Sequence, residues 1–163
     1  MNQSDPFWDS KAESYAKSPI SDEVSYQKKL AETQQYLRSE MQVLEFGCGT
    51  GSTAIKHAPY VKHINAIDIS KKMLEIGRSR SKEARINNIT FCQGTLEGFA
   101  ANTESQDAVL GLNVIHLIPN RKSVLEEVAR ILKPGGIFVS STGCLGNSYL
   151  RFIKFLAPLG KRL

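Results

Sequence analysis

The sequence has no apolar run that approaches the roughly 18 residues of a membrane-spanning helix. Its first residues, Met1-Asn2-Gln3-Ser4-Asp5, lack the basic and then apolar order of a signal peptide. There is also no internal repeat and no low-complexity tract. These absences favour a cytoplasmic protein, and membrane contact is not expected.

Cysteine is scarce, and Cys48, Cys92 and Cys144 are widely spaced and stand apart from the histidines. A metal site built from cysteine and histidine needs these residues at short intervals, so no bound metal is expected. We interpret the three cysteines as reduced residues of the core or of loops. Cys48 alone has an alternative, because it precedes a predicted helix and a thiol near a helix N-terminus can be reactive.

Positive charge is only in mild excess, with a net charge of +5 at pH 7. Part of the excess lies in Arg78, Arg80, Lys82 and Arg85, whose helical spacing we interpret as a solvated face. No basic stripe interleaved with aromatic residues is present. A nucleic-acid partner is therefore not expected.

What remains is the composition of an ordinary globular protein, with 41% hydrophobic and 23% charged residues in 163. This length fits a single domain over residues 1–163. Two helices are predicted at its start, Phe7–Lys17 and Ser21 to about Arg38, from the spacing of their apolar residues. The second has apolar positions at Val24, Leu30 and Leu37. Neither helix fits the alternation that follows, so we expect residues 1–40 to form a helical cap.

From residue 41 the chain alternates between strand and helix patterns. The predicted strands are Gln42–Phe46, His63–Asp68, Ile89–Gln93, Asp107–Leu112 and Ile137–Thr142. The predicted helices are Ser52–Tyr60, a helix capped by Ser70 that runs to about Ile86, and Arg121–Leu132, capped by Asn120. Core-facing positions are Met73, Leu74, Ile76 and Gly77 in the second helix, and Val124, Leu125, Val128, Ile131 and Leu132 in the third. The segment Lys133-Pro134-Gly135-Gly136 is predicted to end the third helix.

The predicted strands have the composition of buried strands rather than an alternation of polarity, and Asp107–Leu112 is a continuous apolar run. This favours a parallel sheet with helices on both faces. Right-handed crossovers then give the strand order 3-2-1-4-5, a Rossmann-like α/β fold. Ligands of such sheets bind at the carboxyl ends of the strands, beside the point where the order reverses. The segments at those ends are Gly47 to Gly51, Asp68, Gly94-Thr95 and Leu112-Asn113.

The stretch from Val43 to Gly51 is an apolar strand that runs into Gly47, Gly49 and Gly51. Glycines at such a turn allow positive φ and let a ligand approach backbone N–H groups. The dinucleotide fingerprint has its third glycine one position later, where this chain has Ser52. An NAD-linked enzyme is therefore the weaker interpretation, and a turn that merely joins strand to helix is another.

Asp68 ends the second predicted strand, where a carboxylate can accept hydrogen bonds from both hydroxyls of a ribose. Dinucleotide cofactors and other nucleoside cofactors are both bound by such an acid. Asp68 therefore indicates a nucleoside cofactor but does not distinguish between these classes. A purely structural alternative is an N-cap-like role at the helix that begins near Ser70.

An ordered set of motifs gives the chain its most specific signal. The set comprises E-F-G-C-G-T-G from Glu45, A-I-D-I-S from Ala66, G-T-L-E from Gly94, G-L-N-V-I-H-L from Gly111 and L-K-P-G-G-I-F-V-S-S-T from Leu132. In this order and spacing, it resembles the class I S-adenosylmethionine-dependent methyltransferases, and most of all their small-molecule branch, type 11 or 12. The match covers about residues 43–142. The cofactor-binding core would then be residues 41–142.

The resemblance implies S-adenosylmethionine as cofactor, S-adenosylhomocysteine as product and a small molecule as methyl acceptor. By the same resemblance, Glu45 orders the glycine loop and approaches the cofactor's amino group, and Asp68 binds the ribose. The other implied cofactor residues are Gly47, Gly49 and Gly51 under the methionine portion, Ile69 and Met73 beside the adenine, Thr95 and the Leu96 backbone at the adenine amino group, Leu112 or Asn113 at the amino-acid end, and Tyr15 and Tyr26 over the carboxylate. Thr95 stands where many members have an acid.

His116 follows the fourth predicted strand and, by the resemblance, faces the methyl acceptor. It is the one candidate catalytic base, and lining the pocket is the alternative. We interpret His57 and His63 as structural or solvated.

Members of this family continue beyond the fifth strand, whereas this sequence stops at Leu163 and so resembles a truncated member. Residues 143–163 are expected to be a helical segment. A fifth strand left as an apolar edge predicts a homodimer, formed through that edge or through a helix at Tyr149–Leu156. The alternative function is a non-catalytic module that binds the cofactor or a partner.

Overall fold

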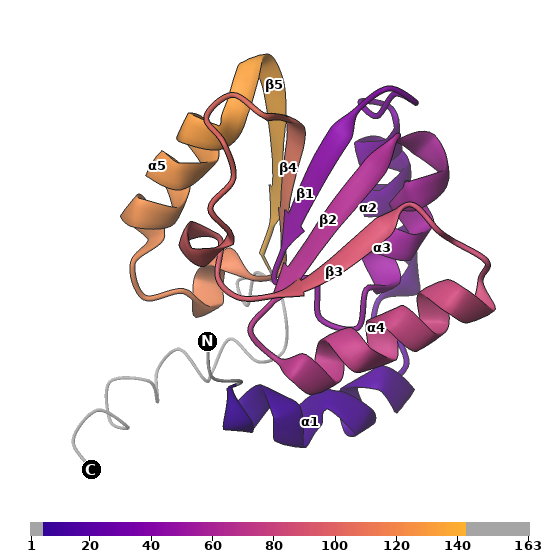
Figure 1. Cartoon of the computed structure of the whole chain (residues 1–163). Helices are drawn as coiled ribbons and strands as arrows, with labels where there is room; N and C mark the ends of the chain where they lie inside the picture. The colour runs from indigo at the N-terminus through magenta and orange to yellow at the C-terminus, as the bar shows by residue number, and fades with distance from the viewer. Residues whose placement is uncertain (1–4, 143–163) are drawn as a thin grey trace.

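The computed structural model describes residues 5–142 of the chain (Figure 1). Its α-helices are α1 (Pro6–Lys17), α2 (Glu23–Gln34), α3 (Ser52–His57), α4 (Lys71–Glu83) and α5 (Arg121–Ile131). Its strands are β1 (Gln42–Phe46), β2 (His63–Asp68), β3 (Ile89–Gln93), β4 (Gln106–Leu112) and β5 (Leu132–Ser141). Three short 3-10 turns are η1 (Ala58–Tyr60), η2 (Glu97–Phe99) and η3 (Ile115–Leu117).

The five strands form one parallel sheet in the order β3-β2-β1-β4-β5. This confirms the predicted order and the Rossmann-like α/β fold. β1 lies at the centre, where Leu44 is paired with Asn65 of β2 and with Val109 of β4. β3 and β5 are the two edges of the described sheet. In Figure 1, α5 lies to one side of the sheet and α3 and α4 lie to the other.

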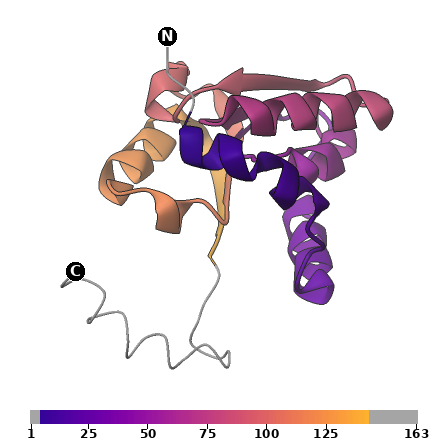
Figure 2. The same ribbon diagram turned by 90° about the horizontal axis from the view of Figure 1, so that it is seen from below.

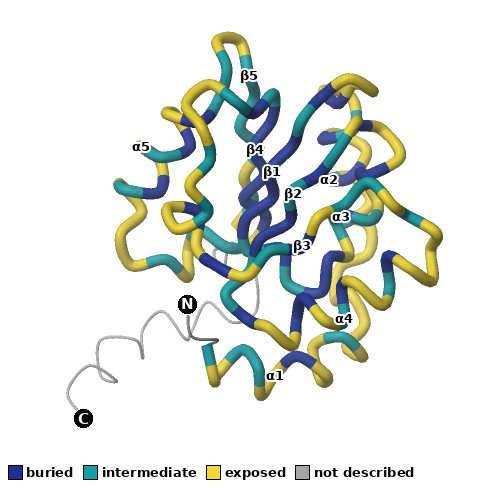
Figure 3. The backbone as a smooth tube through the Cα atoms, in the orientation of Figure 1, coloured by how far each residue is buried: buried dark blue, intermediate teal, exposed yellow. Residues whose placement is uncertain are grey.

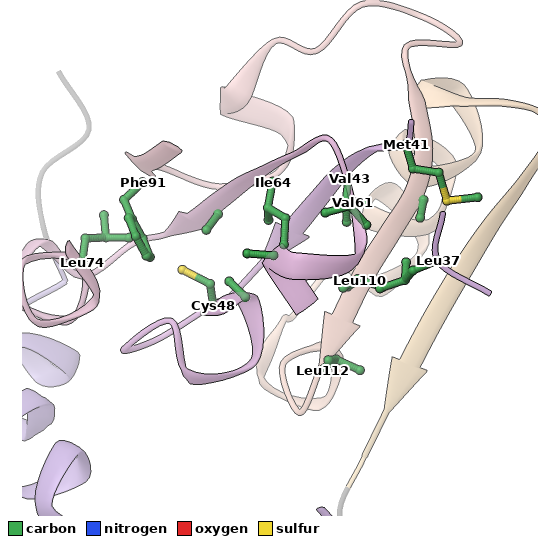
Figure 4. Packing of buried hydrophobic residues seen from close by; sticks show 14 residues of the cluster. Leu37, Met41, Val43, Cys48, Val61, Ile64, Leu74, Phe91, Leu110 and Leu112 are labelled. Atoms are coloured by element: carbon green, nitrogen blue, oxygen red, sulfur yellow. The ribbon is translucent and has the colours of Figure 1, made fainter. Parts of the chain in front are cut away.

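Alternate residues of the strands supply two apolar clusters, one on each face of the sheet. Val43 belongs to the cluster that includes Leu74 of α4, and Figure 4 shows that cluster from close by. Leu44 belongs to the opposite cluster, which includes Val128 of α5. The most deeply buried parts of the backbone in Figure 3 run along β1 and β4. Successive strand side chains point to opposite faces, so both clusters draw on the same strands.

The predicted N-caps of the later helices are confirmed. Ser70 Oγ accepts a hydrogen bond from the Met73 N–H at 3.1 Å, and Asn120 Oδ1 accepts one from the Ser123 N–H at 3.2 Å. These side chains satisfy N–H groups that the first turn of a helix leaves unpaired. Both helices therefore begin where the sequence predicts.

Several predicted helix ends differ from the observed ones. α2 begins after Asp22, whose Oδ1 accepts a hydrogen bond from the Ser25 N–H at 2.9 Å, and it ends at Gln34 rather than near Arg38. The Ser52–Tyr60 helix is α-helical only to His57, because Pro59 lies in the 3-10 turn η1. A proline has no N–H with which to continue an α-helix.

The fifth strand begins five residues earlier than predicted, at Leu132 instead of Ile137. The third helix ends at Ile131, just before Lys133 to Gly136, as predicted. The same segment also interrupts the pairing inside β5, because Gln106 is paired with Leu132 and Ala108 with Ile137. Lys133 Nζ donates a hydrogen bond to Asp107 Oδ1 at 2.8 Å across this irregularity. Proline and glycine therefore follow the end of a helix and also mark an irregularity in a strand.

Three predicted core positions are not buried. Leu125 is 46% exposed, while Ile76 and Leu132 are only partly buried. Val24, an apolar position of the second predicted helix, is 81% exposed. Only Leu30 and Thr33 of α2 are buried, so its N-terminal half, which includes Val24, stands clear of the core.

The two N-terminal helices pack on helices of one face, α1 on α4 and α2 on α3. Figure 2, seen from below, shows α1 beside α4. Within residues 5–142 no helix combines the length and apolar character needed to cross a membrane. The predicted C-terminal helical segment, with Tyr149–Leu156 and Cys144, lies outside the described residues.

Candidate functional site

The turn after β1 is built on left-handed backbone. Gly47, Gly49 and Gly51 have φ values of +62°, +53° and +70°. The turn is closed by a hydrogen bond from the Gly51 N–H to the Cys48 carbonyl at 3.0 Å, and Cys48 donates its own N–H to the Ile67 carbonyl of β2. L-residues with side chains avoid this region of φ, which explains why three glycines stand here.

The three glycines have different surroundings. A Cβ on Gly47 would lie 2.2 Å from Val114 Cγ2, and a Cβ on Gly51 would lie 2.8 Å from Phe91 Cε1. A Cβ on Gly49 would meet only Tyr15 Cε1, at 3.8 Å. Gly47 and Gly51 are therefore needed for packing, whereas Gly49 faces open space that a ligand can use.

Asp68 ties this turn to the end of β2. Its Oδ2 accepts a hydrogen bond from the Gly49 N–H at 2.8 Å, and its Oδ1 accepts one from the Ser70 N–H at 2.9 Å. Burial raises the pKa of Asp68, although these hydrogen bonds act in the opposite direction. Asp68 thus contacts the residue that caps α4, but the N-cap itself is Ser70. Each carboxylate oxygen retains further acceptor capacity for a ligand hydroxyl.

Glu45 lies beneath the turn and is almost wholly buried, at 2% exposed. Its Oε2 has no hydrogen-bond partner among the described residues. Burial raises the pKa of Glu45 to about 8, with the nearby Lys29 charge acting against this rise and Asp68 adding to it. A buried polar atom without a partner is costly in a folded protein, and such atoms occur at functional sites.

Tyr26 and Lys29 of α2 approach Glu45 from the cap. Burial raises the pKa of Tyr26, while a hydrogen bond with Thr53 in the first turn of α3 lowers it. Lys29 Nζ lies 5.3 Å from the centroid of the Tyr26 ring, and burial lowers the pKa of Lys29. Sequence reasoning missed Lys29. The available signal was its position one helical turn after Tyr26, on the same face of α2.

His57 is completely buried, and neither ring nitrogen has a hydrogen-bond partner within residues 5–142. Burial, helped by the Lys29 charge, lowers the pKa of His57 to about 4. The imidazole is therefore neutral near pH 7, and the solvated alternative for His57 is wrong. His63 lies at the start of β2, where Nε2 is 3.0 Å from Thr90 Oγ1.

The predicted adenine side gathers around the ends of β2 and β3. Met73 is 2% exposed and Leu96 is 3% exposed, so the Leu96 side chain belongs to the core. Thr95 is exposed, and its Oγ1 accepts a hydrogen bond from the Gly98 N–H at 3.1 Å. The Ile69 carbonyl accepts one from the Asp5 N–H at 3.4 Å. These contacts leave the Thr95 hydroxyl proton available.

After β4, Leu112 is buried while Asn113 is exposed with a φ of +57°. The Asn113 N–H donates to the Ser141 carbonyl at 2.9 Å, and Asn113 Oδ1 accepts from Ser141 Oγ at 3.2 Å.

His116 is exposed in η3, and its backbone carbonyl accepts a hydrogen bond from Arg121. Within the described residues no contact joins the His116 ring to the glycine turn.

Helix α1 is docked by polar contacts at both ends. Near its start, Asp9 Oδ1 accepts hydrogen bonds from Ser70 Oγ at 2.7 Å and from the Lys72 N–H at 3.2 Å. Near its end, Arg80 donates to the Ala16 carbonyl at 2.6 Å and also to Thr50 Oγ1 at 2.9 Å. The interpretation of Arg80 as part of a solvated face is therefore wrong, since it joins α1, α4 and the glycine turn.

Two further observations bear on other predicted chemistry. Burial raises the pKa of the Cys48 thiol well above its ordinary value, so this cysteine lacks the thiolate that reactivity requires. In residues 5–142, no group of three or more His, Cys, Asp or Glu is placed to hold a metal ion.

The structure also has a shallow groove of about 460 Å³ away from the glycine turn. It lies between α2, α3 and the residues that follow α4, and its lining includes Leu30, Ile55 and Tyr60. None of the predicted site residues lines it. The candidate site is instead the set that meets at the glycine turn, namely Tyr15, Tyr26, Glu45, Gly49 and Asp68, together with Lys29.

Comparison with known proteins shows the family of the chain. A family model described as a methyltransferase domain matches residues 37–154. The chain is 34% identical over 102 residues to the uncharacterized methyltransferase YcgJ of Bacillus subtilis, which covers 63% of this chain and 40% of that protein. It is 29% identical over 127 residues to a demethylmenaquinone methyltransferase of Leptospira interrogans, which covers 75% of this chain and 51% of that protein.

The crystal structure of YcgJ from Bacillus subtilis matches with a TM-score of 0.71 at 28% identity, over 82% of this chain and 58% of that chain. The chain thus spans about half the length of the curated relatives it matches. The family match favours the methyltransferase interpretation of the glycine turn over the dinucleotide one.

The unequal surroundings of the glycines predict unequal effects of alanine. All three alanine variants place a side chain at positive φ, which costs about 1–2 kcal/mol. Gly47→Ala and Gly51→Ala also force a methyl group onto Val114 or Phe91, which adds roughly 1–3 kcal/mol. Urea denaturation should show a smaller loss for Gly49→Ala than for the other two. Equal losses at all three positions would contradict the distinction.

The raised pKa of Glu45 predicts a pH-dependent stability difference. Glu45 has an ordinary pKa of 4.5 and a folded-state pKa of about 8, so the folded protein holds a proton that the unfolded chain has lost between these values. That contribution is complete below pH 4.5 and is lost as the pH rises to 8. Glu45→Gln should therefore gain stability relative to the wild type from pH 5 to pH 8, by a few kcal/mol at most on the scale of about 1.4 kcal/mol per pKa unit.

Glu13→Gln, on the exposed surface of α1, is the matched control for that experiment. Its difference from the wild type should stay nearly constant over the same pH range. The lowered pKa of His57 acts in the opposite direction. Its contribution to the free energy of unfolding is complete above pH 6.5 and is lost as the pH falls toward 4. It is common to all three proteins and cancels in the comparison. A pH-independent Glu45→Gln difference would show that Glu45 is ionised in the folded state.

Proposed function

The chain belongs to a family of methyltransferase domains, and from this we propose that it transfers a methyl group from S-adenosylmethionine to a small molecule. The observation that carries the proposal is the glycine turn at the carboxyl end of β1, with Asp68 bound to the Gly49 N–H. This turn lies where the strand order of the sheet reverses, the usual ligand site of such sheets.

The residues present fit this cofactor on two counts. The open space at Gly49 lets a ligand approach the backbone where a Cβ would intrude. Glu45 Oε2 is a buried acceptor without a partner in residues 5–142, as expected of an atom that binds a ligand group. We assign Glu45 to the amino group of the cofactor and Asp68 to the ribose hydroxyls.

The remaining assignments follow the positions of the residues around the turn. Ile69, Met73, Thr95 and the Leu96 backbone would line the adenine side. Tyr15 and Tyr26 of the cap would cover the amino-acid end, near Leu112 and Asn113. The Tyr15 ring supports this part of the proposal, because its Cε1 lies 3.8 Å from the position that a Cβ on Gly49 would take.

When bound, the cofactor supplies a methyl group already activated by its sulfonium charge. The chain then has to hold the acceptor in line with that methyl group and to exclude water, and such orientation can be worth about 7–11 kcal/mol. We assign the exclusion of water to α1 and α2 as a cap. His116, exposed in η3, would serve as a base where the acceptor arrives protonated, or else as part of the acceptor pocket.

A small-molecule acceptor is supported by the relative named as a demethylmenaquinone methyltransferase. A second candidate is a non-catalytic module that binds the cofactor. Both candidates share the same cofactor site.

Calorimetric titration with S-adenosylmethionine and S-adenosylhomocysteine tests the shared site. We expect both ligands to bind the full chain, and Gly49→Ala to weaken binding by at least about tenfold while remaining folded, because its methyl group fills the open space. NADH should leave the melting temperature unchanged. A folded chain that binds neither ligand would refute both candidates, and labelled methyl transfer to a panel of small acceptors then separates enzyme from binding module.

Within residues 5–142, β5 is an edge strand of the sheet, and we propose that it adds a strand from a second copy. Light scattering should give a mass near twice the calculated 18.1 kDa at high protein concentration. Ser140→Lys, which places a charge at an exposed position of β5, should shift the mass toward the monomer. A monodisperse monomer at all concentrations would contradict this prediction.

A further inference from the structure

A cation beside the glycine turn lacks an anionic partner. Lys29 is half-buried, and its ammonium lies 5.3 Å from the centroid of the Tyr26 ring. Within residues 5–142 it belongs to none of the ion pairs. An ammonium removed from water needs compensation by an anion or by hydrogen bonds, and one aromatic ring supplies only part of it.

The two titratable groups that interact with Lys29 do not supply that anion. Glu45 has a pKa of about 8 and is therefore mostly protonated at pH 7. His57, with a pKa of about 4, is neutral at the same pH. Lys29 thus carries a positive charge that neither of these neighbours neutralises.

The same place holds an unsatisfied acceptor. Glu45 is 2% exposed, and its Oε2 has no partner among the described residues. Lys29 and Glu45 interact electrostatically, so a cation without an anion and a buried carboxyl oxygen without a donor belong to the same part of the site. Such a pair is complementary to a group that carries a carboxylate and, on the neighbouring atom, a hydrogen-bond donor such as an ammonium.

We propose that Lys29 binds the carboxylate of the cofactor's amino-acid end, while Glu45 binds the ammonium of the same end. The inference rests on the proposed function and adds a residue that the motif resemblance does not supply. Tyr26 holds the Lys29 side chain by its ring, and Tyr15, next to the open space at Gly49, bounds the same end of the site.

This assignment makes Lys29 a specificity residue. A ligand with the complete amino-acid end engages both Lys29 and Glu45. An adenosine thioether without that end, such as 5′-methylthioadenosine, engages only the ribose and adenine side of the site. Removal of the Lys29 charge should therefore weaken the first kind of ligand and leave the second kind unchanged.

The experiment is a calorimetric titration of four full-length proteins with two ligands, S-adenosylhomocysteine and 5′-methylthioadenosine. The proteins are the wild type, Lys29→Met, Lys29→Arg and Lys28→Met. Methionine keeps the length and apolar stem of lysine without its charge, and Lys28 is an exposed neighbour on α2 that serves as the control. Melting temperatures of all four proteins establish that each is folded.

We expect Lys29→Met to lower the affinity for S-adenosylhomocysteine by at least about tenfold, as for the loss of a hydrogen bond between charged groups. Its affinity for 5′-methylthioadenosine should equal that of the wild type. Lys29→Arg should retain most of the affinity for S-adenosylhomocysteine, and Lys28→Met should match the wild type with both ligands.

Equal losses for the two ligands in Lys29→Met, or no loss for either, would overturn the assignment of Lys29 and leave the proposed function intact. Failure of the folded wild type to bind S-adenosylhomocysteine would overturn the proposed function and this inference together. The two kinds of failure are thereby distinguishable.

Discussion

The carboxylate of Asp68 is the contact on which the rest of the site depends. One of its oxygens accepts a hydrogen bond from the turn after β1, and the other accepts one from the turn after β2. Two parallel strands have no hairpin to join them, so their carboxyl ends are brought into register only by the sheet and by contacts such as these. The Gly49 backbone is held in its left-handed conformation by this carboxylate, and the open space beside Gly49 exists because the backbone is held there.

Glu45 lies at a buried position of β1 where an apolar residue would favour the stability of the fold. An apolar residue at this buried position of β1 would have no unpaired oxygen and no raised pKa. His57, also buried without a hydrogen-bond partner in the described part of the chain, adds a second group of this kind on α3. Natural proteins depart from an ideal core mainly at functional sites, and both of these side chains interact electrostatically with Lys29 of α2.

The sheet could be predicted from the sequence because its strands are short apolar runs bounded by strong turn residues. β1, β2 and β3 lie where predicted, and Ser70 and Asn120 cap their helices. The start of β5 could not be predicted, because the register that bridges Lys133 to Gly136 is set by pairing with β4 rather than by local preference. Arg80 and Lys29 were missed for a related reason: their roles depend on α1 and α2, whose positions over the core no local pattern specifies.

The way in which α1 is attached has a consequence for the exchange of ligands. Ala12 is its only buried residue, and its contacts with α4 and the glycine turn are largely hydrogen bonds that water can replace. Little apolar surface would therefore be uncovered if this helix swung away, and the free energy of such a local opening would be well below that of global unfolding. Tyr15 would move with it. Local opening of α1 would therefore expose the glycine turn to ligands while the sheet beneath remains intact.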